Sequence, residues 1–146
     1  MSSMADIEAK IRESVANGEE YMSDNQLNLF DQLLLALQQK TINLISTTKE
    51  DITKPASEAD SIDNASIETD MALKLKLIDR QTKLLSKIDL SRNMIEQKTY
   101  GYCEETGEEI GIERLLLRPT ATMSVDAKSI REEEEKDYGS SENDAN

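Results

Sequence analysis

Histidine and tryptophan are absent from this chain of 146 residues, and cysteine and phenylalanine occur once each. With no histidine and a single thiol, at Cys103, the sequence excludes serine–histidine and cysteine–histidine nucleophilic pairs, histidine acid–base chemistry and metal cages built from several cysteines. One cysteine also cannot form an internal disulfide, which is compatible with a reducing compartment. We therefore expect a protein that is not an enzyme.

Material for a large core is also scarce. Apolar residues make up 37% of the chain and aromatic residues only 3%, so a sheet sandwich or a deep barrel would lack its usual filling. No stretch approaches the ~18 apolar residues of a membrane helix, and the N-terminus has no basic segment followed by an apolar run. We expect an elongated, mainly all-α protein that is soluble, cytoplasmic and independent of membranes.

Positive charge is in the minority, since the formal net charge is −13. Each contact with a nucleic-acid phosphate needs a lysine or arginine, so this balance argues against direct DNA binding. The charge is uneven: residues 74–98 hold seven basic and three acidic side chains, whereas residues 132–135 are all glutamate. On charge alone, both stretches can be solvated helix faces.

The first of two long helical arms opens at Ser23 and Asp24, which are residue types that cap helices. It ends before Pro55, because proline cannot donate a backbone hydrogen bond and disfavours helix at the residue before it. Between these limits, residues spaced alternately by three and four form a coiled-coil seam. The seam residues are Leu27, Phe30, Leu34, Leu37, Thr41, Leu44 and Thr48.

The second arm begins near residues 64–66 and contains no glycine or proline before Gly101. Each arm has about thirty residues and spans roughly 45 Å at ~1.5 Å per residue, so the pair predicts an antiparallel hairpin over 23–98 with its tip at 55–66. The apolar stripe of the second arm is Met71, Leu75, Ile78, Leu85, Ile88 and Ile95.

Shorter elements flank the hairpin. Within residues 1–22, the spacing of Ile7, Ile11 and Val15 predicts a helix over 4–16 that packs on the base of the hairpin. After Thr99, three glycines in eleven residues predict a compact knuckle, which with a final helix over 126–137 makes a unit of residues 99–138. Residues 139–146 are polar enough to be disordered.

The knuckle sequence Tyr-Gly-Tyr-Cys-Glu-x-x-Gly-x-x-Ile-Gly-Ile-x-Arg-Leu at 100–115, with Arg-Pro-Thr-Ala at 118–121, resembles the DksA/TraR family of bacterial RNA polymerase regulators, in its DksA branch. The likeness covers nearly the whole chain. It implies a protein that binds RNA polymerase in its secondary channel and modulates initiation at ribosomal RNA and stringent-response promoters. It also implies a monomer that does not read DNA sequence directly.

Family members commonly carry four zinc-binding cysteines in the knuckle. The matching positions here are Cys103, Thr106, Ser124 and Ala127. One thiolate cannot replace a tetrahedral site, so the chain is similar to zinc-independent variants, and we expect no metal cofactor. Cys103 is then either a small apolar residue or a redox sensor. The knuckle would be held by packing of Tyr100, Tyr102, Ile110, Ile112, Leu115, Met123 and Val125.

At the tip, Asp60, Asp63 and Ala65 match the Asp-x-x-Asp-x-Ala motif that the family brings near the polymerase active centre. Carboxylates at a loop apex can accept hydrogen bonds from basic or amide donors or influence a bound magnesium ion. On spacing alone, the two aspartates can equally be turn and cap residues.

The resemblance further implies a site for the alarmone guanosine tetraphosphate, shared with polymerase. Arg80 and Lys87 are seven residues apart and therefore on one helix face, where ordinary solvated charge is the alternative. The residues implied are Arg80, Leu84, Lys87, Arg118, Asp126 and Lys128. Other functions stay open: assistance to transcript cleavage, or a coiled-coil adaptor without an alarmone response.

Overall fold

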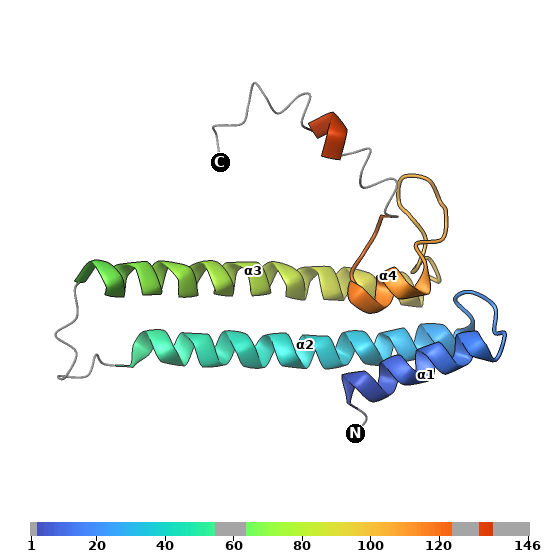
Figure 1. Ribbon diagram of the computed structural model, residues 1–146, viewed down its shortest axis with the longest axis horizontal. Coiled ribbons are helices and arrows are strands. Elements are labelled where there is room, and N and C mark those ends of the chain that lie inside the picture. The colour runs from blue at the N-terminus through green and yellow to red at the C-terminus, as the bar shows by residue number, and fades with distance from the viewer. Residues whose placement is uncertain (1–2, 55–63, 124–131, 136–146) are drawn as a thin grey trace.

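A helical hairpin with its base wrapped by shorter elements is the architecture of this chain (Figure 1). The computed structural model describes residues 3–54, 64–123 and 132–135. Helix α1 spans Met4–Ala16, α2 spans Asp24–Thr53, α3 spans Asn64–Glu96 and α4 spans Ile112–Leu117. The two arms and the N-terminal helix therefore fall where the sequence predicts them, whereas α4 was not foreseen inside the knuckle.

The helix ends follow from local chemistry. The Ser3 hydroxyl accepts a hydrogen bond from the Asp6 amide at 3.1 Å, and the Asp6 carboxylate accepts one from the Ser3 amide at 3.2 Å, which together form a capping box. Helix α2 starts at Ser23, whose hydroxyl accepts from the Gln26 amide at 3.1 Å. It ends at Lys54, which is extended, as expected for a residue before proline.

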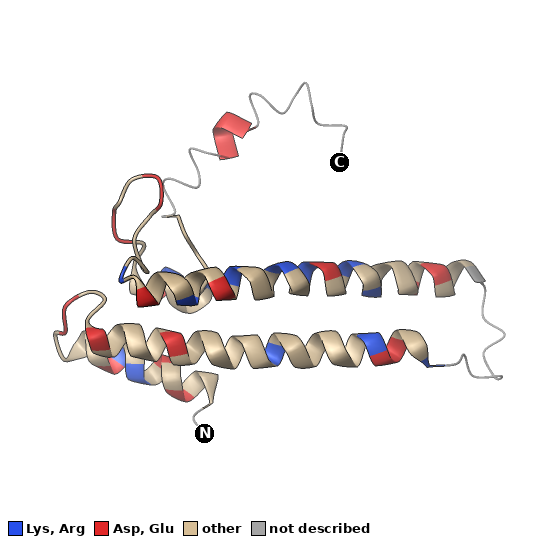
Figure 2. Cartoon of the chain, turned by 180° about the vertical axis from the view of Figure 1, so that it is seen from behind, with Lys and Arg blue, Asp and Glu red and all other residues tan. Residues whose placement is uncertain are grey.

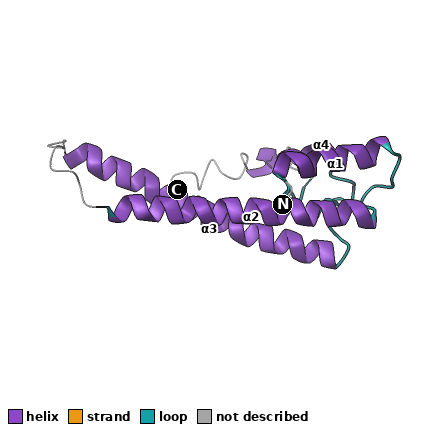
Figure 3. Cartoon of the chain, turned by 90° about the horizontal axis from the view of Figure 1, so that it is seen from below, coloured by secondary structure: helices purple, strands orange, loops and turns teal. Residues whose placement is uncertain are grey.

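The core lies at the base of the hairpin, where α1 packs on α2 and the knuckle covers the end of α3 (Figures 1 and 3). Its fully buried members come from all of these elements: Ile11, Phe30, Leu33, Leu34, Ile88, Tyr100 and Leu115. The rings of Phe30 and Tyr100 lie 5.4 Å apart between centroids, so the long arm and the knuckle share one core.

Away from the base, the hairpin is only two helices thick. Each arm then covers one side of the other, and several predicted seam residues are exposed: Leu44 by 40%, Met71 by 40% and Leu75 by 54%. The buried seam positions in α2 include two threonines, Thr41 and Thr48, as the sequence predicts. Hydrophobic burial therefore decreases from the base toward the tip.

Two further packing predictions are wrong. Val15 is 47% exposed, and Ser14 lies buried on α1 instead, with its hydroxyl donating to the Ile11 carbonyl at 2.6 Å. Tyr102 is 36% exposed, and its ring makes an edge-on contact with Tyr21. The other described residues of the predicted knuckle packing are buried or half-buried, and Val125 lies outside the described residues.

Polar pairs join the two arms along one side. The Arg92 guanidinium donates to the Asp31 carboxylate at 2.9 Å, and the Gln38 amide donates to Asp89 at 3.2 Å. The hydrogen bond to Asp31 raises the pKa of Arg92. These contacts favour one register of the arms. In the described part of the chain, no helix is both long and apolar enough to cross a membrane.

Candidate functional site

The tip segment connects the far ends of α2 and α3, at the opposite end of the hairpin from α1 and α4 (Figure 1). Asp60 and Asp63 lie outside the described residues. Ala65 is in the first turn of α3, is exposed, and its carbonyl accepts a hydrogen bond from the Thr69 hydroxyl at 2.8 Å. The arms place whatever the tip carries about 45 Å from the base, at ~1.5 Å per residue.

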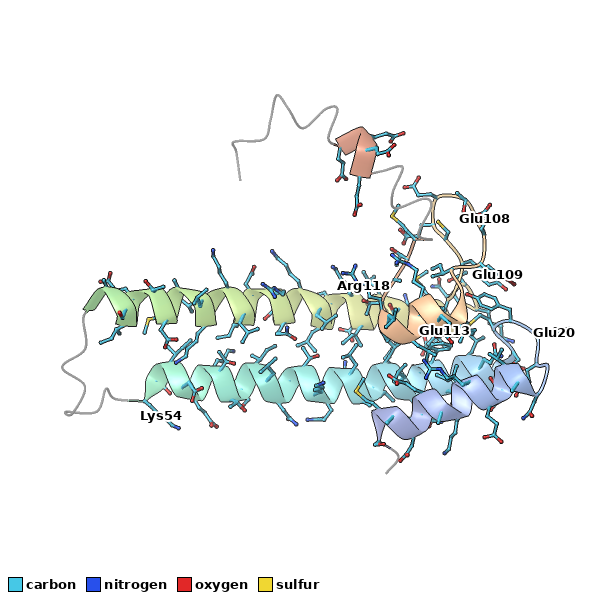
Figure 4. The ribbon with its side chains drawn as sticks, in the orientation of Figure 1. Glu20, Lys54, Glu108, Glu109, Glu113 and Arg118 are labelled. Carbon is cyan, nitrogen blue, oxygen red and sulfur yellow. The ribbon has the colours of Figure 1, made fainter. Side chains whose placement is uncertain are left out.

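A second candidate site lies at the base. A groove of about 440 Å³ runs between the C-terminal part of α3 and the loop that follows α4. Lys87 enters it from α3, while Arg114 and Arg118 enter from α4 and its end, so cations from separate elements converge on one hollow. Figure 4 shows Arg118 beside the base half of α3. This is the geometry required to hold a multiply charged anion.

The loop that forms one wall of the groove is fixed by hydrogen bonds. The Glu104 amide donates to the Thr122 carbonyl at 2.9 Å, and the Ala121 amide donates to the Arg118 carbonyl at 3.0 Å. The Arg114 Nε donates to the Met123 carbonyl at 3.0 Å, which orients the guanidinium at the groove. The cations are thus presented by a preformed surface.

The predicted alarmone residues are only partly brought together. Lys87 and Arg118 share the groove, whereas Arg80 is exposed two turns farther along α3 and does not line it. Leu84 is half-buried against the core. Asp126 and Lys128 lie outside the described residues.

Arg114 was missed by sequence reasoning. The available signal was its spacing: Arg114 and Arg118 are four residues apart, which places them on one face of a single helical turn. Acidic side chains also line the groove and were not expected there, namely Glu104 from the knuckle and Glu132 and Glu135 from the turn at 132–135. Figure 2 shows this turn as an acidic element on the knuckle side of α3.

The knuckle offers a poor donor set for a metal ion. Cys103 is buried, and Thr106 stands at the second cysteine position of the family, while Ser124 and Ala127 lie outside the described residues. Across residues 3–54, 64–123 and 132–135, no cluster of three or more histidine, cysteine, aspartate or glutamate side chains could hold a metal ion. One thiolate with a threonine, a serine and an alanine does not fit the four-ligand zinc site.

Backbone and tyrosine contacts shape the knuckle instead. The Cys103 amide donates to the Glu108 carbonyl at 2.7 Å, and the Gly107 amide donates back to the Cys103 carbonyl at 2.9 Å, so the turn around the cysteine is closed by its own backbone. Gly107 has φ +76°, a conformation that favours glycine.

Two tyrosine hydroxyls tie the knuckle to the rest of the base. Tyr21 donates to the Gly101 carbonyl at 2.6 Å and accepts from the Gly111 amide at 2.9 Å, which clamps both sides of the turn. Tyr100 donates to the Pro119 carbonyl at 2.6 Å. Burial raises the pKa of both phenols, with the hydrogen bond from Gly111 opposing the rise at Tyr21, so each remains a protonated donor near neutral pH.

Comparison with known proteins identifies matches over both halves of the chain. The family model described as DnaK suppressor protein DksA, N-terminal domain, matches residues 26–95, and the model of the prokaryotic dksA/traR C4-type zinc finger matches residues 98–133. An RNA polymerase-binding transcription factor DksA from Caulobacter vibrioides is 48% identical, covering 81% of this chain and 84% of its own length.

Two other relatives agree with this result. The transcription factor of the same name from Escherichia coli K12 is 38% identical over 82% of this chain and 80% of its own length. The solved structure of transcription factor DksA2 from Pseudomonas aeruginosa superimposes with a TM-score of 0.72 at 37% identity, covering 86% of this chain and 98% of that one.

Proposed function

This chain belongs to the DksA family of transcription factors, and from that premise we propose that it binds RNA polymerase and regulates the initiation of transcription. The relatives that carry this function by name match the hairpin and the knuckle together. We propose that the hairpin enters the secondary channel of polymerase, because a narrow two-helix rod with a wide base suits insertion up to a fixed depth. Ribosomal RNA and stringent-response promoters are the expected targets.

The tip would then act on the polymerase active centre. Asp60 and Asp63 would accept hydrogen bonds from polymerase donors, and Ala65 would allow close approach because it has the smallest side chain after glycine. The support for this assignment is the position of the connecting segment at the far end of the arms, together with the Asp-x-x-Asp-x-Ala motif.

The convergence of Lys87 and Arg118 in one groove is the observation that carries the second part of the proposal. We assign this groove as the part of a guanosine tetraphosphate site that the chain contributes to a site shared with polymerase. We add Arg114 to this site because it lines the same groove. The family motif also implies alarmone contacts for Arg80, Leu84, Asp126 and Lys128. Phosphates pair well with guanidinium groups, and Lys87 adds a point charge.

We further propose that the knuckle folds without zinc and that the protein acts as a cytoplasmic monomer without enzymatic activity or direct recognition of DNA sequence. The support for the zinc-free knuckle is its donor set and the tyrosine clamp described above.

Transcription in vitro from a ribosomal RNA promoter, with purified polymerase and with or without guanosine tetraphosphate, tests the proposal. The wild-type chain should change transcript yield, and the alarmone should increase that change. Lys87→Ala/Arg118→Ala should keep the alarmone-independent effect and lose the increase. Lys40→Ala/Lys49→Ala, which removes the same charge from exposed positions on α2, should behave as wild type. No effect of the wild-type chain on yield would refute the function.

A further inference from the structure

The basal groove contains opposed charges contributed by one chain. Its cations are Lys87, Arg114 and Arg118, and its carboxylates are Glu104, Glu132 and Glu135. Glu104 belongs to the fixed knuckle, whose backbone is tied to Thr122. The other two carboxylates come from a separate helical turn, residues 132–135, which Figure 1 shows apart from α3 on the side of the knuckle.

The four glutamates of this turn are not equivalent. Glu132 and Glu135 are three residues apart and therefore share one face of the turn, and both line the groove. Glu133 and Glu134 do not line it, although all four side chains are exposed. The run of four acids thus divides into a pair that lines the groove together with the cations and a pair that does not.

From this arrangement we infer that the turn at 132–135 is an internal competitor for the anion groove: Glu132 and Glu135 occupy the field of the three cations in the free chain and oppose the entry of a phosphate-rich ligand. A ligand with several negative charges must displace the pair or bear its repulsion. The turn therefore sets the ligand concentration at which the groove fills. This inference rests on the proposed use of the groove for a polyphosphate ligand.

The size of the effect follows from Coulomb's law. A carboxylate about 10 Å from a ligand that carries three to four charges weakens binding in water by roughly tenfold before screening, and a Debye length of about 10 Å at 0.1 M salt reduces this effect to roughly two- to threefold. Two such carboxylates should weaken binding roughly three- to tenfold. The penalty should shrink as salt is raised.

Calorimetric titration of the full-length chain with inorganic tripolyphosphate tests the inference without polymerase. Glu132→Gln/Glu135→Gln should bind tripolyphosphate roughly three- to tenfold more tightly than the wild type in low salt. Glu133→Gln/Glu134→Gln is the matched control, because it removes the same charge from the same turn, and it should stay within about twofold of the wild type. Adding Lys87→Ala/Arg118→Ala to the first variant should abolish its gain.

Equal affinities of the two glutamine variants, or no measurable binding by Glu132→Gln/Glu135→Gln, would overturn the inference. A transcription assay separates this outcome from failure of the proposed function. If Glu132→Gln/Glu135→Gln gains affinity for tripolyphosphate but neither it nor the wild type affects transcription, the competitor exists and the polymerase role is wrong. If both are right, this variant should respond to a severalfold lower alarmone concentration.

Discussion

At the scale of single residues, two tyrosine hydroxyls tie the knuckle to the rest of the base. Tyr21 bridges Gly101 and Gly111, and Tyr100 reaches Pro119 across nineteen residues of chain. These hydrogen bonds join neutral groups that are buried or half-buried. Loss of one partner would therefore leave a buried polar group unsatisfied. Cys103, buried beside them, has the environment of a small core residue.

Tyr100→Phe should destabilise the fold by about 1–3 kcal/mol, because the Pro119 carbonyl loses its donor while the apolar ring is retained. Urea unfolding followed by circular dichroism measures the change. Tyr102→Phe is the control, since its ring is partly exposed and should cost less than about 0.5 kcal/mol. Equal stability of the two variants would show that the Tyr100 hydroxyl contributes nothing.

The Tyr100 phenol also leads us to expect that the stability of the fold depends on pH in the alkaline range. The raised pKa of Tyr100 means that the folded chain keeps this proton when the unfolded chain, with an ordinary tyrosine pKa of about 10, releases it. The stability contribution is therefore complete below about pH 10 and is lost as pH rises toward the folded pKa, by up to ~1.4 kcal/mol per pH unit. Urea midpoints between pH 8 and 11 should fall less steeply for Tyr100→Phe than for the wild type. Parallel curves would contradict this assignment.

At the scale of elements, the hairpin is firm at its base and weakly packed toward its tip. Thr41 and Thr48 are buried in the seam of α2. The Thr41 hydroxyl donates to the Leu37 carbonyl at 2.7 Å, and the Thr48 hydroxyl donates to the Leu44 carbonyl at 2.7 Å, so both bonds stay within the helix. Such bonds satisfy the hydroxyl but add nothing between the arms. The outer half of the seam therefore has less hydrophobic contact between the two arms.

Thr41→Val should stabilise the chain by about 0.5–1 kcal/mol, because a methyl group replaces a hydroxyl that bonds only within α2. Thermal unfolding measures this. Thr47→Val is a matched control, because the Thr47 hydroxyl donates to the Asn43 carbonyl at 2.8 Å in the same way but lies on an exposed face. This substitution should change stability by less than about 0.5 kcal/mol. Destabilisation by Thr41→Val would mean that its hydroxyl serves the seam.

The knuckle carries a prediction of its own. Incubation of the purified chain with excess chelator should leave its circular dichroism spectrum and its urea midpoint unchanged, because three of the four cysteine positions of the zinc site hold threonine, serine and alanine. Metal analysis of the untreated protein should find far less than one zinc per chain. Unfolding by the chelator would show that the tyrosine clamp and the core at Leu115 do not suffice.

The sequence predicts elements better than packing. Caps and breakers are local, so Ser23 and Pro55 locate the two ends of α2. Burial depends on which neighbour covers a face, and no local pattern shows that the outer seam at Leu44 and Leu75 has one partner helix only. The groove illustrates the same limit: Lys87 and Arg118 came from the family motif, whereas Arg114 and the opposing glutamates required the fold.

At the scale of the whole molecule, the two candidate sites lie at opposite ends of the hairpin. In the function proposed above, the tip would act at a depth fixed by the length of the arms, while the groove would stay with the base. On that proposal, a ligand in the groove would influence the tip by changing how firmly the base binds polymerase. The net charge of −13 is unevenly distributed, and the groove cation Lys87 belongs to the basic stretch of residues 74–98.

The proposed role of the tip is tested by the lifetime of open complexes at a ribosomal RNA promoter, measured together with polymerase binding for the wild type and Asp63→Asn. The substitution removes one charge and keeps the size of the side chain. We expect the wild type to shorten the lifetime, and Asp63→Asn to bind polymerase with nearly unchanged affinity but to lose that effect. A variant that still shortens the lifetime as the wild type does would contradict the assignment of the tip as the acting end of the molecule.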